Sequence, residues 1–412
     1  MLKNYIKIAY KVFLRRKFFT FISLFAISFT LIVLMVTAAI LDHVYGPMPP
    51  ETKLDRMLGV YQMRFFAPSG RGRMTGTVGY AFLDRYARNL PNVERVSFCY
   101  GPSTVYSYWN GEKIKSSLKR TDGEFWQVLD FTFLEGGPFT TEDERNANFV
   151  AVINEATRKK FFGAEPATGK TIEVDGQRFR VAGVVANVPQ FRFVPFSDVW
   201  VPISTAKTSL YRGFLNDGFQ AIMLANSAAD FPMIKDEFKS RIAQMEFPDP
   251  SQYDRATGEP ETLIEYSSRQ FGQDESYPKS FLAAIAMLMV LFMLLPAVNL
   301  ININVSRIME RAGEIGVRKA FGASSWTLVG QFVVENVLLT LIGAAIALLA
   351  SYFVLQALTE SGLIPYAEFH LNHRIFLYGL SLAVFFGLFS GVYPAWKMSR
   401  LHPVQALRGG VR

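Results

Sequence analysis

Four long apolar stretches constrain this chain more than any other feature of its sequence. They are residues 18–41, 280–303, 327–358 and 375–396. Together they contain a single charged residue, Glu335. At about 1.5 Å of rise per residue, a helix over residues 18–41 is about 36 Å long, enough to cross a hydrocarbon core of about 30 Å. The sequence therefore predicts a membrane protein with four transmembrane α-helices.

The first apolar stretch could instead be a secretory signal peptide. A signal peptide has an apolar run of roughly 7–15 residues, closed by small residues at the cleavage site. Residues 18–41 form a longer run with no convincing site of that kind, so we expect an uncleaved membrane anchor.

The excess of positive over negative charge lies in three short segments. Residues 1–17, 304–326 and 397–412 hold 14 Lys and Arg against 2 acids, whereas residues 42–279 hold 28 bases and 30 acids. Lys and Arg in short loops mark the cytoplasmic side of a membrane protein. We therefore expect both termini and the loop 304–326 inside, and residues 42–279 and 359–374 outside. This distribution also argues against a nucleic-acid partner.

Residues 1–17 and 42–279 are the two parts outside the membrane with recognisable structure. Lys3, Lys7 and Lys11 recur every four residues, which favours an amphipathic cytoplasmic helix over 1–17. Segment 42–279 mixes strand and helix patterns and predicts an α+β domain. The expected strands are 58–66, 93–100, 104–109, 149–153, 171–174, 179–185 and 221–225, and the expected helices are 79–89, 154–162 and 231–245. Residues 68–76 and 248–260 are expected to be exposed loops.

The apolar stretches contain a few residues with a specific expected role. Pro296 removes a backbone donor inside the second stretch and should kink that helix. Small residues recur every four positions in the third and fourth stretches, which permits close helix packing within one subunit or between two. They are Gly343, Ala347, Ser351, Gly379, Ala383, Gly387 and Gly391. Membrane helices are also rich in small residues without such a role.

Glu335 is the only acid in the apolar stretches, and intramembrane acids are candidates for function. It lies about two turns from the expected inner end of its helix. We favour a structural pair with Arg318 or Lys319.

The loop between the second and third stretches carries the most specific motif of the chain. It includes Glu310-Arg311, Glu314-Ile315-Gly316-Val317-Arg318-Lys319-Ala320 and Gly322-Ala323. A second motif near the end consists of Tyr393-Pro394-Ala395, Arg400, Pro403 and Ala406-Leu407-Arg408. Both resemble signatures of the MacB/FtsX-type permeases of ATP-binding-cassette (ABC) transporters. Met398 and His402 are departures from the second signature. Residues 121–139 and 150–185 resemble the external domain of the same family, although Gly137 stands where Arg is usual.

The resemblance implies that the loop 304–326 contains a short helix that docks on a separate cytoplasmic ATPase. The residues implied in this coupling are Arg307, Glu310, Arg311, Glu314, Ile315, Gly316, Arg318, Lys319 and Gly322. It also implies a bacterial inner-membrane location and a second permease subunit, identical or different. A periplasmic membrane-fusion protein is a further implied partner. ATP and Mg²⁺ would be bound by the ATPase, and this chain is expected to be a permease without enzymatic activity or cofactor of its own.

Three sequence features suggest a nucleotide, metal or catalytic site but lack the residues that such a site needs. Residues 163–171 resemble a phosphate-binding loop, but five residues separate the first glycine from the Gly-Lys pair, whereas the motif requires four. His370 and His373 have the spacing of a metal pair with only Glu368 nearby, so we expect no metal site. Cys99, the only cysteine, has no evident catalytic partner and excludes an intramolecular disulfide. Residues 191–196 form an apolar run that is either an exposed contact surface or a packed turn.

The sequence favours a permease that converts ATP-driven closure of its ATPase into movement of the external domain. In this hypothesis the second helix joins the external domain to the docking loop. Two alternatives stay open at the sequence level. The chain could be a scaffold that activates cell-wall hydrolases, or a sensor that reports a peptide to a signalling partner. The substrate cannot be read from the residues.

Overall fold

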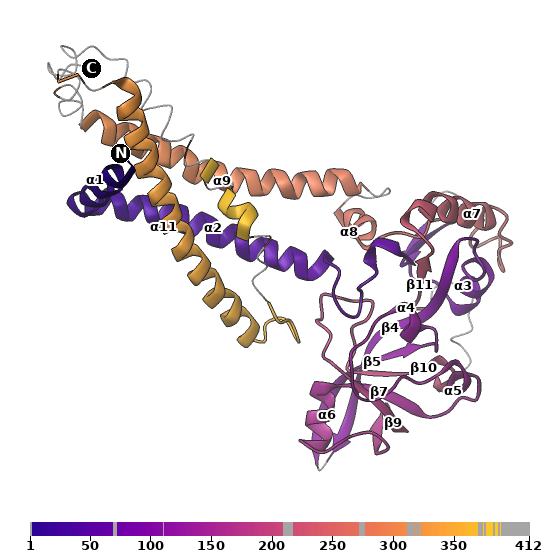
Figure 1. Ribbon diagram of the computed structural model, residues 1–412. Helices are drawn as coiled ribbons and strands as arrows, with labels where there is room; N and C mark the ends of the chain where they lie inside the picture. The colour runs from indigo at the N-terminus through magenta and orange to yellow at the C-terminus, as the bar shows by residue number, and fades with distance from the viewer. Residues whose placement is uncertain are drawn as a thin grey trace. The chain divides into compact units, whose positions relative to one another are not determined.

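The computed structural model of the chain describes residues 2–68, 72–109, 111–208, 217–271, 277–310, 317, 321–322, 324–369, 374, 376–381, 384–385 and 388. The chain divides into two compact units (Figure 1). The helical unit comprises the described residues of Met1–Asp42, Lys279–Leu363 and Glu368–Arg412. The large domain comprises the described residues of His43–Pro278 together with Ile364–Ala367.

The helical unit contains four labelled helices. They are α1 (Leu2–Arg15), α2 (Lys17–Tyr45, which extends a few residues past the unit), α9 (Pro278–Glu310) and α11 (Ser325–Glu360). Among the described residues, α2 and the Val329–Glu360 part of α11 are long and apolar enough to cross a membrane. The corresponding apolar helix at the start of α9, Pro278–Phe292, is shorter. Four transmembrane helices therefore remain a prediction, as does their orientation.

Helices α2 and α11 pack closely at a glycine and a serine, whose small side chains allow the approach. The Ser28 hydroxyl donates to the carbonyl of Gly343 at 3.0 Å. A Cβ atom on Gly343 would lie 2.7 Å from Cγ2 of Ile27, closer than two carbon atoms can approach. Side chains from both helices are buried at this contact. They include Ile27, Leu31, Leu339, Ala344 and Ala347.

The large domain is built on a mixed sheet that contains nine of the described strands. They are β1 (Met57–Val60), β4 (Val93–Trp109), β5 (Glu112–Thr121), β6 (Phe133–Gly136), β7 (Val150–Asn154), β8 (Thr171–Val174), β9 (Gln177–Val185), β10 (Val199–Pro202) and β11 (Phe219–Ala225). Their order is β1-β11-β4-β5-β10-β7-β9-β6, with β8 paired to β9. The β5–β10 and β7–β9 pairs are parallel, and the other pairs are antiparallel.

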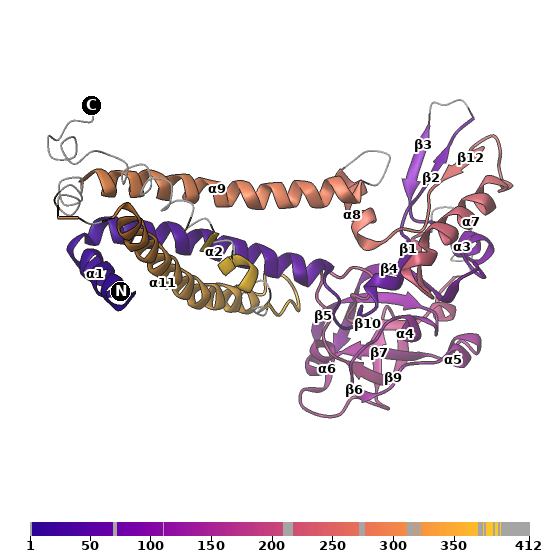
Figure 2. The ribbon, with the colours of Figure 1, turned by 45° about the horizontal axis from the view of Figure 1, so that its top comes forward.

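A second, three-stranded sheet extends from the large domain (Figure 2). It consists of β12 (Arg255–Thr257), β2 (Met63–Phe66) and β3 (Arg73–Gly76), in that order and antiparallel. The predicted loop 68–76 therefore ends in a strand, and the predicted loop 248–260 contains one, which is a correction to the sequence prediction. Their polar composition hid strands that pair only with β2.

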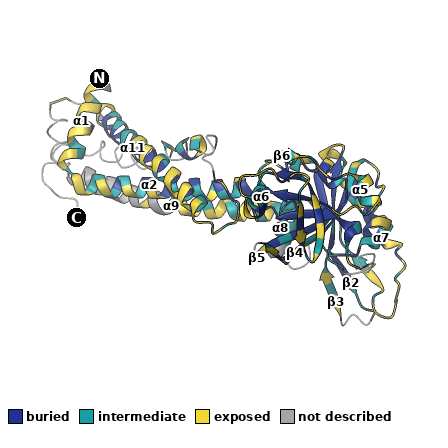
Figure 3. Cartoon of the chain, turned by 90° about the horizontal axis from the view of Figure 1, so that it is seen from below, coloured by how far each residue is buried: buried dark blue, intermediate teal, exposed yellow. Residues whose placement is uncertain are grey.

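The helices of the large domain contribute to separate hydrophobic cores. They are α3 (Tyr80–Tyr86), α4 (Phe125–Val128), α5 (Thr141–Arg145), α6 (Glu155–Phe162), α7 (Phe231–Ala243) and α8 (Leu263–Phe271). Helices α3 and α7 lie side by side (Figure 1) and bury Phe82, Ile234 and Phe238 in one core. A second core gathers Phe125, Trp126 and Trp200, and a third lies beside α6. The buried residues concentrate in the sheet (Figure 3).

Most of the secondary-structure predictions for this domain are confirmed. Strand β8 has the predicted bounds, and α3, α6 and α7 begin within one residue of the predicted starts. Residues 58–66 are instead two strands, because Met57–Val60 joins the main sheet and Met63–Phe66 joins the small one. Residues 163–171 form the turn that leads into β8, and Gly163 and Gly169 have the positive φ angles that such turns need.

Candidate functional site

The residues expected to contact an ATPase lie mostly outside the described part of the chain. Arg307 and Glu310 belong to the last turn of α9. Gly322 has a φ of +86°, the left-handed conformation that ends a helix. Six others lie outside the described residues, so their coupling role stays a prediction. They are Arg311, Glu314, Ile315, Gly316, Arg318 and Lys319.

The residues expected to pack helices are described in part. Ala347 and Ser351 are fully buried, and the Ser351 hydroxyl lies 3.6 Å from the sulfur of Met35 on α2. A Cβ atom on Gly379 would be in ordinary contact with Leu31, at 3.7 Å. Ala383, Gly387 and Gly391 lie outside the described residues. The described small residues therefore contact α2 of the same chain.

Glu335 and Pro296 lie within described helices. Glu335 on α11 is only 3% exposed, and its expected partners Arg318 and Lys319 are outside the described residues. Pro296 lies in α9, and the kink expected there stays a prediction. His370 and His373 also lie outside the described residues. Within the part of the chain that is described, no three His, Cys, Asp or Glu side chains gather as metal ligands.

A different set of residues stands out in the large domain, where three stretches continue from the helical unit. The chain passes between the units after Asp42, after Pro278 and on both sides of Ile364–Ala367. We call residues 43–53 the first link, residues 259–278 the second link and residues 364–367 the third link. All three contact the same short stretch, residues 190–198, which we call the anchor segment.

The first link is held by a buried ion pair. Arg192 of the anchor segment donates from Nη1 to Oε2 of Glu51 at 2.8 Å and from Nη2 to the carbonyl of Gly46 at 2.6 Å. The side chains of Arg192 and Glu51 are 0% and 3% exposed. Burial raises the pKa of Glu51, and the charge of Arg192 opposes that shift. Lys53 of this link also forms an ion pair with Asp130, with 2.8 Å between Nζ and Oδ1.

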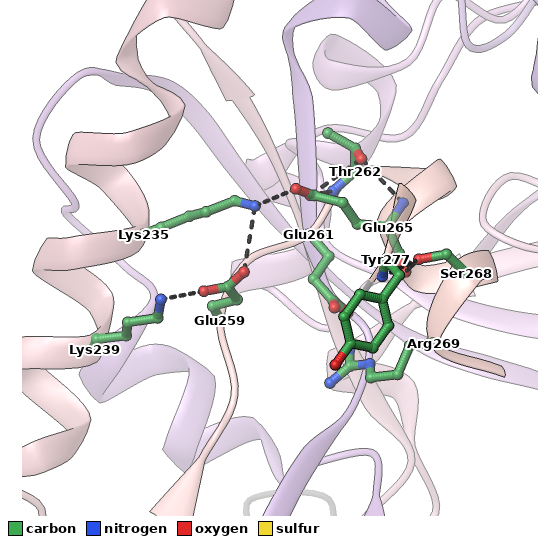
Figure 4. Close-up of polar contacts among 9 residues, drawn as sticks. All are labelled: Lys235, Lys239, Glu259, Glu261, Thr262, Glu265, Ser268, Arg269 and Tyr277. Carbon is green, nitrogen blue, oxygen red and sulfur yellow. Dashed lines mark hydrogen bonds and ion pairs between the residues drawn. The ribbon is translucent and has the colours of Figure 1, made fainter. Parts of the chain in front are cut away.

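The second link contains α8 and a dense polar network (Figure 4). Thr262 and Glu265 cap α8 reciprocally, because the Thr262 amide donates to the Glu265 carboxylate and the Glu265 amide donates to the Thr262 hydroxyl. Lys235 of α7 pairs with Glu265 at 2.6 Å and with Glu259 at 3.4 Å. These contacts fix the start of α8 to α7.

The network continues toward the start of α9. Glu261 forms a buried ion pair with Arg269, whose pKa is lowered to about 10 by burial and by the nearby Arg64. The amide of Tyr277 donates to the Ser268 hydroxyl at 3.1 Å, just before α9 begins. The ring of Tyr266 on α8 lies 5.3 Å from the ring of Phe193, which connects this link to the anchor segment.

The third link is short but has three contacts with the anchor segment. The Tyr366 hydroxyl donates to Oδ1 of Asp198 at 2.6 Å. The amide of Gln190 donates to the carbonyl of Pro365 at 3.1 Å. The rings of Phe196 and Tyr366 lie 6.4 Å apart.

The anchor segment is in turn fixed to the main sheet. The ammonium of Lys119 on β5, which is fully buried, donates to the carbonyls of Phe193 and Val194. Burial lowers the pKa of this lysine. Asp198 accepts from the amide of Ser117 on β5 at 2.7 Å and from the side-chain amide of Asn154 on β7 at 3.1 Å. All three links thus have contacts with one segment that is itself bonded to the main sheet.

The sequence argument did not identify this site, although one signal was present. The apolar run 191–196 contains Arg192, and an arginine inside a buried run needs an acidic partner. The structure shows a packed turn for most of the run: Arg192 and Val194 are each 1% exposed, whereas Phe191 is 38% exposed. The partner Glu51 lies 141 residues away along the chain, which no local pattern can reveal.

Comparison with known protein families gives one match for each of the two units. The family described as the MacB-like periplasmic core domain matches residues 20–241, and the family described as the FtsX-like permease C-terminal matches residues 286–403. Together these matches cover most of the large domain, up to residue 241, and most of the helical unit.

Two relatives illustrate the similarity. The macrolide export ATP-binding/permease protein MacB of Pasteurella multocida is 25% identical over 300 residues, which cover 71% of this chain and 43% of that protein. The uncharacterized ABC transporter permease YvrN of Bacillus subtilis is 27% identical over 292 residues, covering 70% of this chain and 68% of that protein. The chain thus spans less than half the length of that MacB.

Among solved structures, the periplasmic region of MacB from Actinobacillus actinomycetemcomitans is similar at 18% identity and a TM-score of 0.35. The match covers 45% of this chain and 83% of that one. Membership in a family of permeases with a periplasmic core domain implies a membrane location and an extracytoplasmic large domain. On the two family matches, the chain belongs to the MacB/FtsX-like permeases of ABC transporters.

Proposed function

We propose that this chain is the permease subunit that converts ATP hydrolysis by a separate cytoplasmic ATPase into movement of its extracytoplasmic large domain. The movement would serve export or extraction of a substrate. The observation that carries the proposal is the anchor segment, where all three links meet and are fixed to the main sheet.

Such a transmission needs links that do not yield under load. A loop held only by exposed hydrogen bonds opens at little cost in free energy, whereas a buried polar network opens with the domain core. The Glu51–Arg192 and Glu261–Arg269 pairs are buried, so breaking either would leave an uncompensated charge in the interior. Movement of the helices is therefore expected to move the large domain as a body.

The inner end of this transmission is the loop 304–326. We assign the ATPase contact to the charged residues of that loop, with Glu314 and Arg318 as its central pair. Four transmembrane helices, cytoplasmic termini and a second permease subunit complete the proposed assembly. A membrane-fusion protein on the outer side is compatible with it.

Substitution of the loop tests the proposal. The chain and its ATPase are co-purified, and the ATPase rate is compared with and without the chain for Glu314→Ala, Arg318→Ala and the control Lys397→Ala. Lys397 is also basic and expected to be cytoplasmic, but it lies outside the loop. We expect both loop variants to lose the stimulation while the control keeps it. Full stimulation by both loop variants would contradict the proposal.

A further inference from the structure

One side of helix α1 carries a row of basic side chains. The row, which we call the basic row, consists of Lys3, Lys7, Lys11 and Arg15, all of them exposed. A spacing of four residues places them along one side of a helix. Among the described residues, no carboxylate forms an ion pair with any of the four. Residues 1–17 contain no acid at all, so the basic row is a strip of uncompensated positive charge.

A row of large apolar side chains runs beside the basic row. This apolar row consists of Ile6, Tyr10 and Leu14, which are 43%, 62% and 53% exposed. Each of the three follows a lysine of the basic row by three residues, and residues three apart are neighbours on a helix surface. Helices that lie in a membrane interface have this composition, with apolar groups among the acyl chains and bases toward the headgroups.

The remaining side of α1 packs within the helical unit. Ala9 is only 1% exposed, and Phe13 packs against the core that α2 and α11 share. A Cβ atom on Gly330 of α11 would lie 3.9 Å from the ring of Tyr5. Figure 2 shows α1 next to α11, in agreement with these contacts. The inward side of α1 is thus occupied by the chain itself, and the two rows face outward.

The chain also determines the level of α1 relative to the membrane. Helix α2, which is long and apolar enough to cross a membrane, begins at Lys17, two residues after α1 ends. The chain turns sharply between the two helices (Figures 1 and 2), and the Thr20 hydroxyl donates to the carbonyl of Phe13 across this turn at 3.3 Å. A helix held this close to the end of a membrane span lies at the level of the lipid headgroups, so its outward side faces lipid.

We propose that the outward side of α1 is a binding site for anionic phospholipid. The headgroup phosphates would meet the basic row, and the apolar row would enter the acyl boundary beside them. Each base next to an anionic membrane surface strengthens such binding. The site shares no residue with the anchor segment or with the loop 304–326, so its failure leaves the proposed coupling role untouched.

Competition between two lipids tests the site in the full chain. The chain is purified in a neutral detergent and incubated with equal amounts of phosphatidylglycerol and phosphatidylcholine of the same acyl chains. Native mass spectrometry then measures how much of each lipid is bound. Because only the headgroups differ, the ratio of the two reports the preference for negative charge. We expect at least about a tenfold preference for phosphatidylglycerol.

Variants of the basic row locate the preference. Lys3→Gln/Lys7→Gln/Lys11→Gln should reduce it at least about fivefold, because three positive charges are lost. Lys3→Arg/Lys7→Arg/Lys11→Arg keeps the charges and should keep the preference. All of these side chains are exposed, and melting temperatures in detergent verify that both variants fold.

Two further variants separate the site from general charge attraction. The control Lys113→Gln/Lys115→Gln/Lys160→Gln removes three exposed lysines of the large domain and should change the preference less than about twofold. Tyr10→Ser/Leu14→Ser should weaken the binding of both lipids, because their acyl chains are the same.

Three results would overturn the inference. The first is equal binding of the two lipids by the wild-type chain, and the second is an equal loss of preference in the α1 glutamine variant and in the large-domain control. The third is displacement of phosphatidylglycerol by soluble glycerol 3-phosphate, which has the phosphate but no acyl chains. That displacement would show that the basic row binds a soluble phosphate ester and not a membrane lipid.

Discussion

The guanidinium of Arg192 lies 2.8 Å from the carboxylate of Glu51, and both side chains are almost completely buried. This pair joins the stretch that follows α2 to the stretch that precedes β10. Since the second guanidinium nitrogen binds the carbonyl of Gly46, one side chain holds the first link at two points. The residues that directly follow α2 are thereby fixed to the core of the large domain.

Removal of Arg192 alone should strongly destabilise the large domain. Arg192→Met leaves the Glu51 carboxylate buried without a partner, which typically costs about 3–5 kcal/mol. The double variant Arg192→Met/Glu51→Leu replaces both charges by apolar groups and should recover most of that loss. Denaturant unfolding of the full chain, followed by tryptophan fluorescence, measures both. A single variant that loses less than about 1 kcal/mol would show that the pair is not buried in solution.

The contact between α2 and α11 predicts opposite effects of alanine at two glycines of one helix. A Cβ atom at Gly343 would lie 3.0 Å from Cβ of Ile27, which cannot rotate away, whereas the nearest atom at Gly330 is 3.9 Å distant. Gly343→Ala should therefore lower the melting temperature in detergent. Gly330→Ala, the matched control, should leave it unchanged or raise it, because alanine favours helix by about 1 kcal/mol. Equal behaviour of the two variants would contradict the packing.

Asp122 predicts a specific pH dependence of stability. Burial raises the pKa of its carboxyl from 3.8 to about 7, although Ser97 and the amides of Phe98 and Phe125 donate to it. The folded chain then holds this proton more tightly than the unfolded chain. The resulting stabilisation is complete below about pH 4 and is lost as the pH rises to about 7, by on the order of a few kcal/mol.

The difference between wild type and Asp122→Asn isolates this contribution. Other carboxylates of the domain have lowered pKa values, such as Asp130 and Glu259, and give the opposite slope in both proteins. The free energy of unfolding is measured at several pH values for each protein. The stability of wild type relative to Asp122→Asn should fall between about pH 4 and pH 7. A constant difference across this range would contradict the raised pKa.

Local patterns in the sequence predicted strands with alternating polarity, such as β8, and also the wholly apolar strand β7. In β8, Ile172 and Val174 are buried while Thr171 and Glu173 are exposed, and its predicted bounds are correct. Strand β5 was missed because its sequence, Glu112–Thr121, is mostly polar and depends on pairing with both β4 and β10. The boundary between β1 and β2 is likewise set by partner strands far along the chain.

The anchor segment lies beyond local patterns for the same reason. Its contacts join Arg192 to Glu51, Phe193 to Tyr266 and Asp198 to Tyr366, each separated by more than 70 residues. The sequence argument assigned the connection between membrane and large domain to the second helix alone. The structure adds the contacts of the first and third links, and the third link belongs to residues 359–374, of which only an external location was expected.

The central claim is that a contact in the large domain influences ATP hydrolysis on the other side of the membrane. The most direct measurement compares Tyr366→Phe with Tyr106→Phe in the complex of the chain and its ATPase. Each variant loses one hydroxyl, but only that of Tyr366 binds Asp198 and ties the third link to the anchor segment. We predict that Tyr366→Phe lowers the stimulated ATPase rate about fivefold, equivalent to a coupling free energy of about 1 kcal/mol, while Tyr106→Phe leaves it unchanged. Equal rates in wild type and both variants would contradict the claim.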